Sequence, residues 1–234
     1  MNNENAVQVS LRGEPSPGHP VFQLRNARLS VRASAQSLLA VDELTLYPAE
    51  RVVITGPSGA GKSLLLSMIT GRWAPALEFC GTRTCHASRI GYIPQRGQDA
   101  LHPLLPLGRQ LAKATAAAAQ RVGEVLAAVG LDDPRLLGRR PAELSGGQGQ
   151  RAAIALAVLS GAPLILADEP TSALDHSSRD RTLSMLQSVL TEKQTLVMVT
   201  HDPVAAQALA TRQLAVDSGR IIPLQSAAAQ RATA

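Results

Sequence analysis

Aromatic residues are scarce in this 234-residue chain, which contains two Phe, two Tyr and one Trp. So few rings argue against binding of single-stranded nucleic acid, which relies on base stacking. The sequence also lacks the run of about 18 apolar residues that spans a membrane, and residues 1–20 lack the apolar core of a secretory signal. We therefore expect a soluble, cytoplasmic protein that does not cross a membrane by itself.

Cysteine is equally rare, since Cys80 and Cys85 are the two that occur, with four residues between them. Haem attachment motifs and zinc knuckles need two intervening residues. Cytoplasmic thiols are normally reduced. We interpret both cysteines as structural.

The net charge is basic, with 23 Lys and Arg against 18 Asp and Glu and a formal value of +5. The arginines are scattered, and no run of five basic residues occurs. This pattern is typical of a solvated surface, so no nucleic acid is expected as a partner. Because 45% of the residues are hydrophobic, the chain is not disordered and can form one compact domain.

Hydrophobic patterns divide the chain into alternating strands and helices. Residues 21–31 alternate roughly in polarity and residues 38–46 form a second apolar stretch, and both predict strands of a small antiparallel sheet. Strands that alternate with helices indicate an α/β fold with a largely parallel sheet. Buried parallel strands are expected at residues 51–55, 90–93, 163–167 and 195–200, helices at 62–70, 107–129, 147–160 and 178–192, and weak alternation follows from Thr211.

A glycine-rich segment links the strand at 51–55 to the helix at 62–70 and matches G-x-x-x-x-G-K-[ST], the phosphate-binding loop. Its glycines let backbone N–H groups converge on phosphate oxygens, and the helix N-terminus adds its dipole. Lys62 is expected to reach the β- and γ-phosphates, and the Ser63 hydroxyl to ligate Mg²⁺. The residues expected to bind the nucleotide are Gly56, Pro57, Ser58, Gly59, Ala60, Gly61, Lys62, Ser63 and Leu64.

Two carboxylates, Asp168 and Glu169, follow the apolar run at 163–167. Ligands of open α/β sheets bind at the carboxyl ends of strands, so this strand can deliver both acids beside the phosphate loop. Asp168 suits Mg²⁺, and Glu169 suits a general base that polarises the water attacking the γ-phosphate. An acidic pair before Pro170 is also typical of helix entry, but its pairing with a phosphate loop favours catalysis.

The segment Leu144-Ser-Gly-Gly-Gln148 begins a further helix between these two motifs. Ser145 suits an N-cap, and the paired glycines expose backbone N–H groups at a second anion-binding helix terminus. The segment resembles the LSGGQ signature of ATP-binding cassette (ABC) ATPases. Further motifs resemble those of the same family over about residues 22–222: the Q-loop glutamine at Gln95, the D-loop at residues 172–175 and the switch histidine at His201.

The resemblance implies an α/β fold with a P-loop NTPase (RecA-like) core, a small antiparallel β subdomain and an inserted α-helical subdomain. The ABC ATPase domain would occupy residues 21–222. Within it, the core and the β subdomain would cover 21–95 and 161–222, and the helical subdomain about 96–160. Residues 1–20 and 223–234 are expected to form a flexible N-terminal tail and a frayed C-terminal tail.

The resemblance also implies ATP and Mg²⁺ as cofactors and a head-to-tail pair of cassettes, identical or paralogous, with two nucleotides at the interface. Ser145, Gly147 and Gln148 would then act in trans, and Asp175 would line the interface. Transmembrane permease subunits would be separate chains that dock near residues 96–120, and an extracytoplasmic solute-binding protein would be an indirect partner. The protein would lie at the cytoplasmic face of the cell membrane.

By the same resemblance, the catalytic residues would be Glu169, His201 and Gln95. His201 would contact the γ-phosphate. Gln95 would join Mg²⁺ and the attacking water while sensing the partner subunit. The metal ligands would be Ser63, Gln95 and Asp168.

Residues 94–103 (PQRGQDALHP) resemble the Q-x-P-x-x-S-L-N-P segment of importers for oligopeptides, dipeptides and nickel. The expected function is therefore that of the ATP-hydrolysing subunit of an ABC importer for nickel or another metal chelate, or for di- or oligopeptides. The short chain favours the metal-chelate branch. The alternative is a non-transport cassette, such as the accessory ATPase of carbon–phosphorus lyase.

Two features depart from the family pattern. ABC ATPases usually stack adenine on an aromatic residue that precedes the phosphate loop, but Leu29 to Leu46 contains none. Phe22 or Tyr47 would have to substitute, or base stacking is weak. The short stretch between Lys62 and Gln95 also implies a trimmed antiparallel subdomain.

Overall fold

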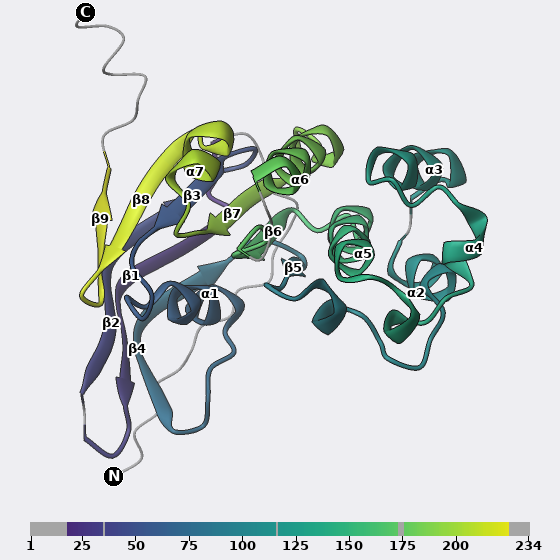
Figure 1. Cartoon of the computed structure of the whole chain (residues 1–234). Coiled ribbons are helices and arrows are strands. Elements are labelled where there is room, and N and C mark those ends of the chain that lie inside the picture. Colours follow the sequence, from purple (N-terminus) through teal and green to yellow (C-terminus); the bar gives the residue numbers. More distant parts are fainter. Residues whose placement is uncertain (1–17, 35, 116, 173–175, 225–234) are drawn as a thin grey trace, which may run out of the picture.

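The computed structural model describes residues 18–34, 36–115, 117–172 and 176–224. Their strands form one nine-stranded sheet in the order β4-β1-β2-β9-β8-β3-β7-β6-β5, with helices on both faces (Figure 1). The strands are β1 (Phe22–Val31), β2 (Ser37–Leu46), β3 (Arg51–Thr55), β4 (Leu77–Cys85), β5 (Ile90–Ile93), β6 (Leu164–Asp168), β7 (Thr195–Val199), β8 (Arg212–Asp217) and β9 (Arg220–Pro223). The helices are α1 (Lys62–Thr70), α2 (Leu107–Ala114), α3 (Ala119–Ala128), α4 (Pro134–Leu137), α5 (Gly146–Leu159), α6 (His176–Val189) and α7 (Pro203–Leu209), with 3-10 turns η1 (Gly97–Ala100) and η2 (Pro141–Glu143).

The predicted parallel sheet is confirmed in β5, β6, β7 and β3, and β8 extends it as a further parallel strand. Both faces of these strands are apolar because each face packs against helices. Ile165 and Met198 belong to the core shared with α5, α6 and α7, whereas Val52 and Val197 belong to the core shared with α1. Since the strands run the same way, the loop after β3 and the acids that end β6 meet at one edge of the sheet.

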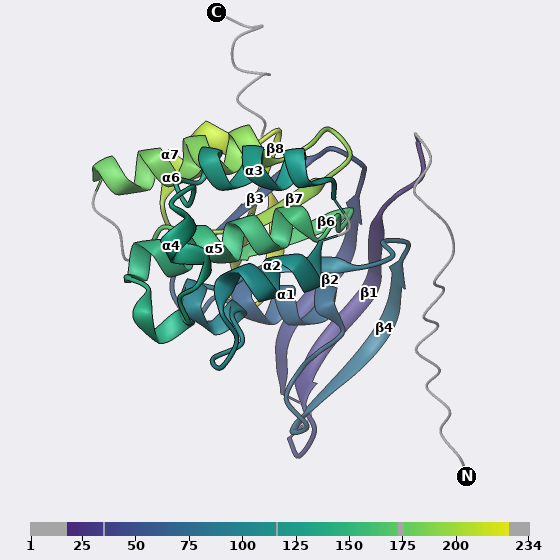
Figure 2. The same ribbon diagram turned by 90° about the vertical axis from the view of Figure 1, so that its right-hand side faces the viewer.

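The predicted antiparallel hairpin is also present, with β1 paired to β2 and to a third strand, β4. Figure 2 shows these three strands extending away from the helices. Strand β4 was not predicted because seven of its nine residues are exposed or half-buried, which leaves no clear apolar alternation. Gly81 lies opposite a bulge in β1, where a Cβ would come within 2.3 Å of the Asn26 carbonyl oxygen. Cys80 and Cys85 lie on β4 as free thiols.

The prediction of one helix over residues 107–129 is wrong, because the chain becomes extended at Thr115 (φ −106°, ψ 138°) and forms two helices, α2 and α3. Leu111 of α2 and Val125 of α3 are both buried, and two separate helices can each turn an apolar face toward the core. Tertiary packing thus overrides the helix propensity of the alanine-rich stretch between them. The short helices α4 and α7, each begun by Asp-Pro, were also missed.

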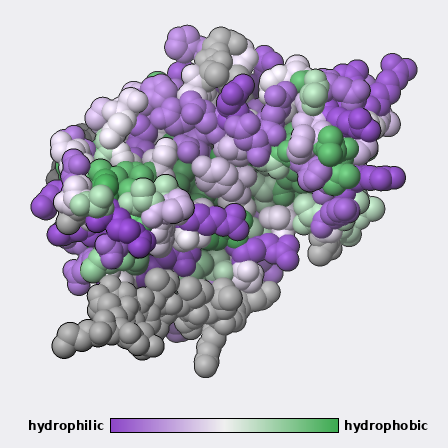
Figure 3. Space-filling view, turned by 90° about the horizontal axis from the view of Figure 1, so that it is seen from below, coloured by the Kyte–Doolittle hydropathy of each residue, from purple (hydrophilic) through white to green (hydrophobic). Residues whose placement is uncertain are grey.

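The weakly alternating stretch from Thr211 forms β8 and β9, and β9 includes Pro223, one residue into the expected C-terminal tail. Of the two predicted tails, residues 18–20 and Leu224 are also described, and residues 1–17 and 225–234 lie outside the described residues. Among the described residues, no helix is both long and apolar enough to cross a bilayer. The face seen in Figure 3 carries hydrophobic residues in patches separated by hydrophilic ones.

The turn η1 packs directly against the start of α5. A Cβ on Gly97 would lie 2.3 Å from the Gln150 Cα atom, and a Cβ on Gly149 would lie 2.8 Å from the Gln98 side chain. The Gln98 amide donates a hydrogen bond to the Leu144 carbonyl at 3.2 Å. The segment after β5 is therefore fixed to the helix that begins with the LSGGQ motif.

This contact predicts that Gly97→Ala destabilises the protein by about 1–3 kcal/mol, because the added methyl group forces backbone apart in a packed region. Gly123→Ala is the matched control. Gly123 lies in α3, and a Cβ added to it would meet no neighbouring side chain or element within 4 Å, so alanine should stabilise the protein by about 1 kcal/mol through helix propensity. Urea unfolding measures both changes, and equal stability of the two variants would contradict the close packing of η1 on α5.

Candidate functional site

The phosphate-binding loop runs from the end of β3 to the start of α1 and is shaped by its glycines. Gly56 passes so close to β8 that a Cβ would lie 2.2 Å from the Val216 carbonyl oxygen. Gly61, the N-cap of α1, has a φ of 114°, which residues other than glycine rarely adopt. No side chain caps the N-terminus of α1, and Gly59 faces open space. The loop therefore presents free backbone donors and a helix dipole, which fit a phosphate group.

Lys62 brings a buried positive charge to this loop, since 6% of the residue is exposed. Its ammonium group donates hydrogen bonds to the carbonyl oxygens of Gly56 at 2.9 Å and Pro57 at 3.0 Å. A third partner is the carboxylate of Glu169, with Nζ 3.4 Å from Oε1. These three partners compensate the burial of the charge.

Asp168 ends β6 and lies beside two hydroxyl groups. The Tyr92 hydroxyl donates a hydrogen bond to its Oδ2 at 3.1 Å, and the Ser63 side chain hydrogen-bonds to the same carboxylate. Burial raises the pKa of Asp168, the hydrogen bonds from Tyr92 and Ser63 partly oppose the rise, and the neighbouring Glu169 adds to it. The oxygens of Ser63 and Asp168 form a donor set suited to Mg²⁺.

Glu169 has a φ of 44°, in the left-handed region that a non-glycine residue rarely adopts. Its N–H donates to the Val199 carbonyl at 2.9 Å, which ties the strained residue to the end of β7. Its Oε2 lies 2.9 Å from His201 Nδ1, while Oε1 faces Lys62. The strained backbone thus aims the carboxylate between a lysine and a histidine, as is common at functional sites.

Gln95 lies across the site and donates a hydrogen bond from Nε2 to the Ser172 hydroxyl at 3.0 Å. A cavity of about 320 Å³ lies between this residue and the loop. The structure therefore brings together most of the residues predicted from the sequence. The cavity is lined by Ser58, Gly59, Gly61, Lys62, Ser63, Leu64, Gln95, Asp168 and Glu169.

The LSGGQ segment lies elsewhere, at the N-terminus of α5. Ser145 and Gln148 form a reciprocal capping box, in which the Ser145 hydroxyl accepts from the Gln148 N–H at 3.2 Å and the Gln148 Oε1 accepts from the Ser145 N–H at 2.9 Å. Gly147 faces open space. None of these residues lines the described cavity, and Asp175 lies outside the described residues.

Of the two alternatives for the missing adenine-stacking residue, substitution by Phe22 or Tyr47 is contradicted by their positions, and weak base stacking stays a prediction. Phe22 is fully buried, with its ring 5.4 Å from the Arg83 guanidinium carbon. Tyr47 precedes β3, whose five residues separate it from the loop by about 16 Å at the usual rise of a strand. The side chain that β2 places beside the loop is aliphatic, since Leu39 lies 3.4 Å from the Cβ position of Gly61.

Comparisons with known proteins agree with this geometry. Residues 39–172 match the family model described as ABC transporter. The macrolide export ATP-binding/permease protein MacB of Rhodopseudomonas palustris (strain HaA2) is 37% identical over 209 residues, which are 80% of this chain and 32% of MacB. The thiamine import ATP-binding protein ThiQ of Shigella sonnei (strain Ss046) is 36% identical over 191 residues, which are 76% of this chain and 82% of ThiQ. A solved structure, described as an inward-facing conformation of a metal-chelate type ABC transporter, superposes with a TM-score of 0.65 and 25% identity over 86% of this chain and 82% of that one.

The fold and the site thus define an ATP-binding domain with a P-loop. The chain belongs to the ABC transporter family, and the expected fold class is confirmed. Members of this family bind ATP together with Mg²⁺. The chain spans 32% of the length of MacB, and the relatives carry the names of both exporters and importers.

The raised pKa of Asp168 predicts that this acid lowers the stability of the folded protein at neutral pH. The folded state binds the proton more tightly than the unfolded state, so stability falls as the pH rises from the usual carboxyl pKa through the raised value. Asp168→Asn should therefore be more stable than the natural protein at pH 7, with a smaller difference at pH 4. Urea unfolding at both pH values measures this, with Asp132→Asn on the exposed surface as the control. A difference that grows toward pH 4 would contradict the expected sign.

Proposed function

We propose that this chain is the ATP-hydrolysing subunit of an ABC transporter. The main support for this proposal is the arrangement of Lys62, Glu169 and His201. In it, one strained glutamate contacts both a phosphate-loop lysine and a histidine. In the proposed mechanism Lys62 binds the β- and γ-phosphates, and Glu169 accepts a proton from the attacking water. His201 contacts the γ-phosphate from the end of β7.

The proposed metal site consists of Ser63, Gln95 and Asp168. Mg²⁺ bound there would neutralise developing charge on the phosphates. Ser63 and Asp168 already share a hydrogen bond, and Gln95 is held on the opposite wall of the cavity by Ser172. The oxygen donors therefore surround the place where the phosphates would lie.

We also propose that two cassettes assemble head to tail, so that Ser145, Gly147 and Gln148 of one copy close the nucleotide site of the other, with Asp175 at the interface. Two observations support this proposal. The capping box leaves the open side of Gly147 uncovered, and the same segment does not line the cavity of its own chain. A two-fold axis would complete both sites at once.

The proposed process is import of a metal chelate, or of di- or oligopeptides, through separate permease subunits at the cytoplasmic face of the cell membrane. It is supported by the importer-like segment 94–103 and by the likeness to a metal-chelate type transporter. The permeases would dock near residues 96–120, on a helical subdomain of about residues 96–160 inserted in a domain of residues 21–222. A solute-binding protein would deliver the solute. Export is the second candidate, since MacB is named for macrolide export.

The direct test of the catalytic proposal is Glu169→Gln. The variant should bind ATP and dimerise, because the loop is intact, but its turnover should fall by about 10²–10⁴-fold through loss of the general base. Glu192→Gln, on the exposed surface, is the control with the same chemical change. Phosphate release and equilibrium nucleotide binding are the measurements, and rapid turnover by Glu169→Gln would remove Glu169 from the role of base.

A second prediction concerns the base of the nucleotide. Leu38 and Leu39 flank the loop on the β2 side, and their side chains provide neither a ring for stacking nor a hydrogen bond. Discrimination between ATP and GTP should therefore be weaker than about tenfold, because pockets without polar contacts discriminate poorly. Competition of both nucleotides against a fluorescent ATP analogue measures the ratio, and a preference above about 100-fold would show a base-reading group elsewhere.

Transport is tested by affinity capture of the full-length protein from native membranes. Permease subunits and a solute-binding protein encoded beside it would support import. Co-purification with enzymes of phosphonate breakdown would instead support the non-transport alternative.

A further inference from the structure

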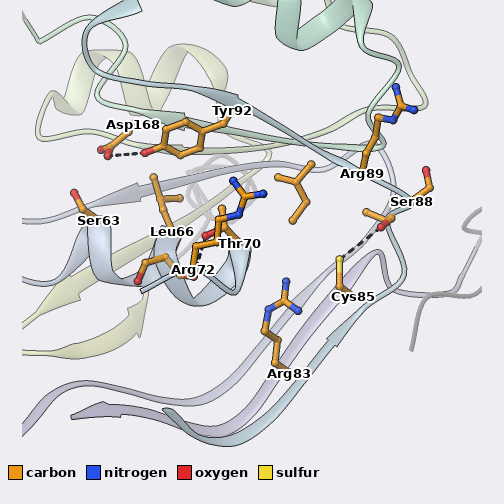
Figure 4. A pocket seen from close by; sticks show the side chains of 13 residues that line it. Ser63, Leu66, Thr70, Arg72, Arg83, Cys85, Ser88, Arg89, Tyr92 and Asp168 are labelled. Carbon is orange, nitrogen blue, oxygen red and sulfur yellow. Dashed lines mark hydrogen bonds between the residues drawn. The ribbon is translucent and has the colours of Figure 1, made fainter. Parts of the chain in front are cut away.

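Tyr92 lies where two hollows of the surface meet. The larger is a cavity of about 690 Å³ between α1 and the strands β4 and β5, and the smaller is a hollow of about 420 Å³ between β5 and α2. Figure 4 shows Tyr92 pointing along the larger cavity toward Asp168, with Ser63 below the same carboxylate. The tyrosine is 40% exposed, so burial of its ring does not explain the position of its hydroxyl.

The Tyr92 hydroxyl makes a hydrogen bond that the sequence motif of the phosphate-binding loop does not predict. It donates to Asp168 Oδ2 at 3.1 Å, from a strand separated from Asp168 by 76 positions in the sequence. The strands β5 and β6 are parallel neighbours with Tyr92 opposite Leu166, so the side chain reaches two residues along β6 to its end.

A carboxylate has about four acceptor positions, and a fixed hydrogen bond to one oxygen orients the others. Asp168 sits at the end of its strand, where rotation about its side-chain bonds would move both oxygens. The Tyr92 and Ser63 hydroxyls contact it from different elements, β5 and α1. Two donors from different elements hold one rotamer better than Ser63 alone.

We propose that Tyr92 is a positioning residue that holds the Asp168 carboxylate in the orientation needed for Mg²⁺. This inference rests on the proposed function, because it assumes that Asp168 serves a magnesium–nucleotide complex. Tyr92 itself does not line the nucleotide cavity. It acts through Asp168.

The test is Tyr92→Phe, which removes the hydroxyl and retains the ring. Mg²⁺-dependent binding of a fluorescent ATP analogue should require about 3–10-fold more Mg²⁺, since a hydrogen bond to a charged group is lost. At saturating Mg²⁺ the turnover should return close to that of the natural protein.

Tyr47→Phe is the matched control, because Tyr47 is the one other tyrosine of the chain. Its hydrogen bonds to Glu50 and Thr195 are made by its main chain. Tyrosine difference absorption on adding Mg²⁺ and a non-hydrolysable ATP analogue should show a band that disappears in Tyr92→Phe and persists in Tyr47→Phe. A purely structural role would lower the unfolding midpoint without this selective loss.

The outcomes separate the two proposals. An unchanged Mg²⁺ requirement in Tyr92→Phe, with activity intact in the natural protein, overturns the role of Tyr92 and leaves the proposed function in place. Failure of the natural protein to bind the analogue in a Mg²⁺-dependent manner overturns the proposed function itself. A shift in Tyr92→Phe that Tyr47→Phe does not share supports the inference.

Discussion

The ion pair between Lys62 and Glu169, 3.4 Å long, is the contact on which the site depends. It exists because β3 and β6 flank β7 in parallel, so that the loop after β3 and the acids after β6 reach the same edge of the sheet. A lysine buried this deeply needs compensation, and two loop carbonyls and one carboxylate provide it. The Lys62 ammonium group therefore holds both the phosphate-binding loop and the Glu169 carboxylate in place.

The site is built at a cost to stability. Glu169 adopts a left-handed backbone conformation, the pKa of Asp168 is raised by burial, and α1 begins without a side-chain cap. Each feature disfavours the folded state, and each lies at the site proposed to bind the phosphates of the nucleotide. Two apolar cores, one on each face of the parallel strands, offset the cost and keep the edge of the sheet rigid.

The parallel strands and the phosphate loop could be predicted from the sequence because their signals are local: β-branched runs, then glycines, then a lysine. Strand β4 could not, because its exposed residues leave no apolar pattern. The break between α2 and α3 depends on which faces are buried, and the stretch around Thr115 is alanine-rich and typical of continuous helix. The contact of Tyr92 with Asp168 was missed because it joins residues on neighbouring strands that are distant in sequence. Phe22 and Tyr47 fail as base platforms because the Phe22 ring is buried and Tyr47 lies the length of β3 away from the loop, which no local pattern shows.

The segment after β5 connects the nucleotide cavity to the N-terminus of α5, where the LSGGQ motif lies. Gln95 contacts Ser172 at the nucleotide cavity, and Gly97 packs without a side chain against Gln150 of α5. The Gln98 amide bonds to the carbonyl just before Ser145. A displacement of Gln95 must therefore either strain this short segment or move the N-terminus of α5 with it, because close-packed contacts do not deform continuously. In a head-to-tail pair, the nucleotide held by one loop would in this way affect the position of the signature that its own chain offers to the partner.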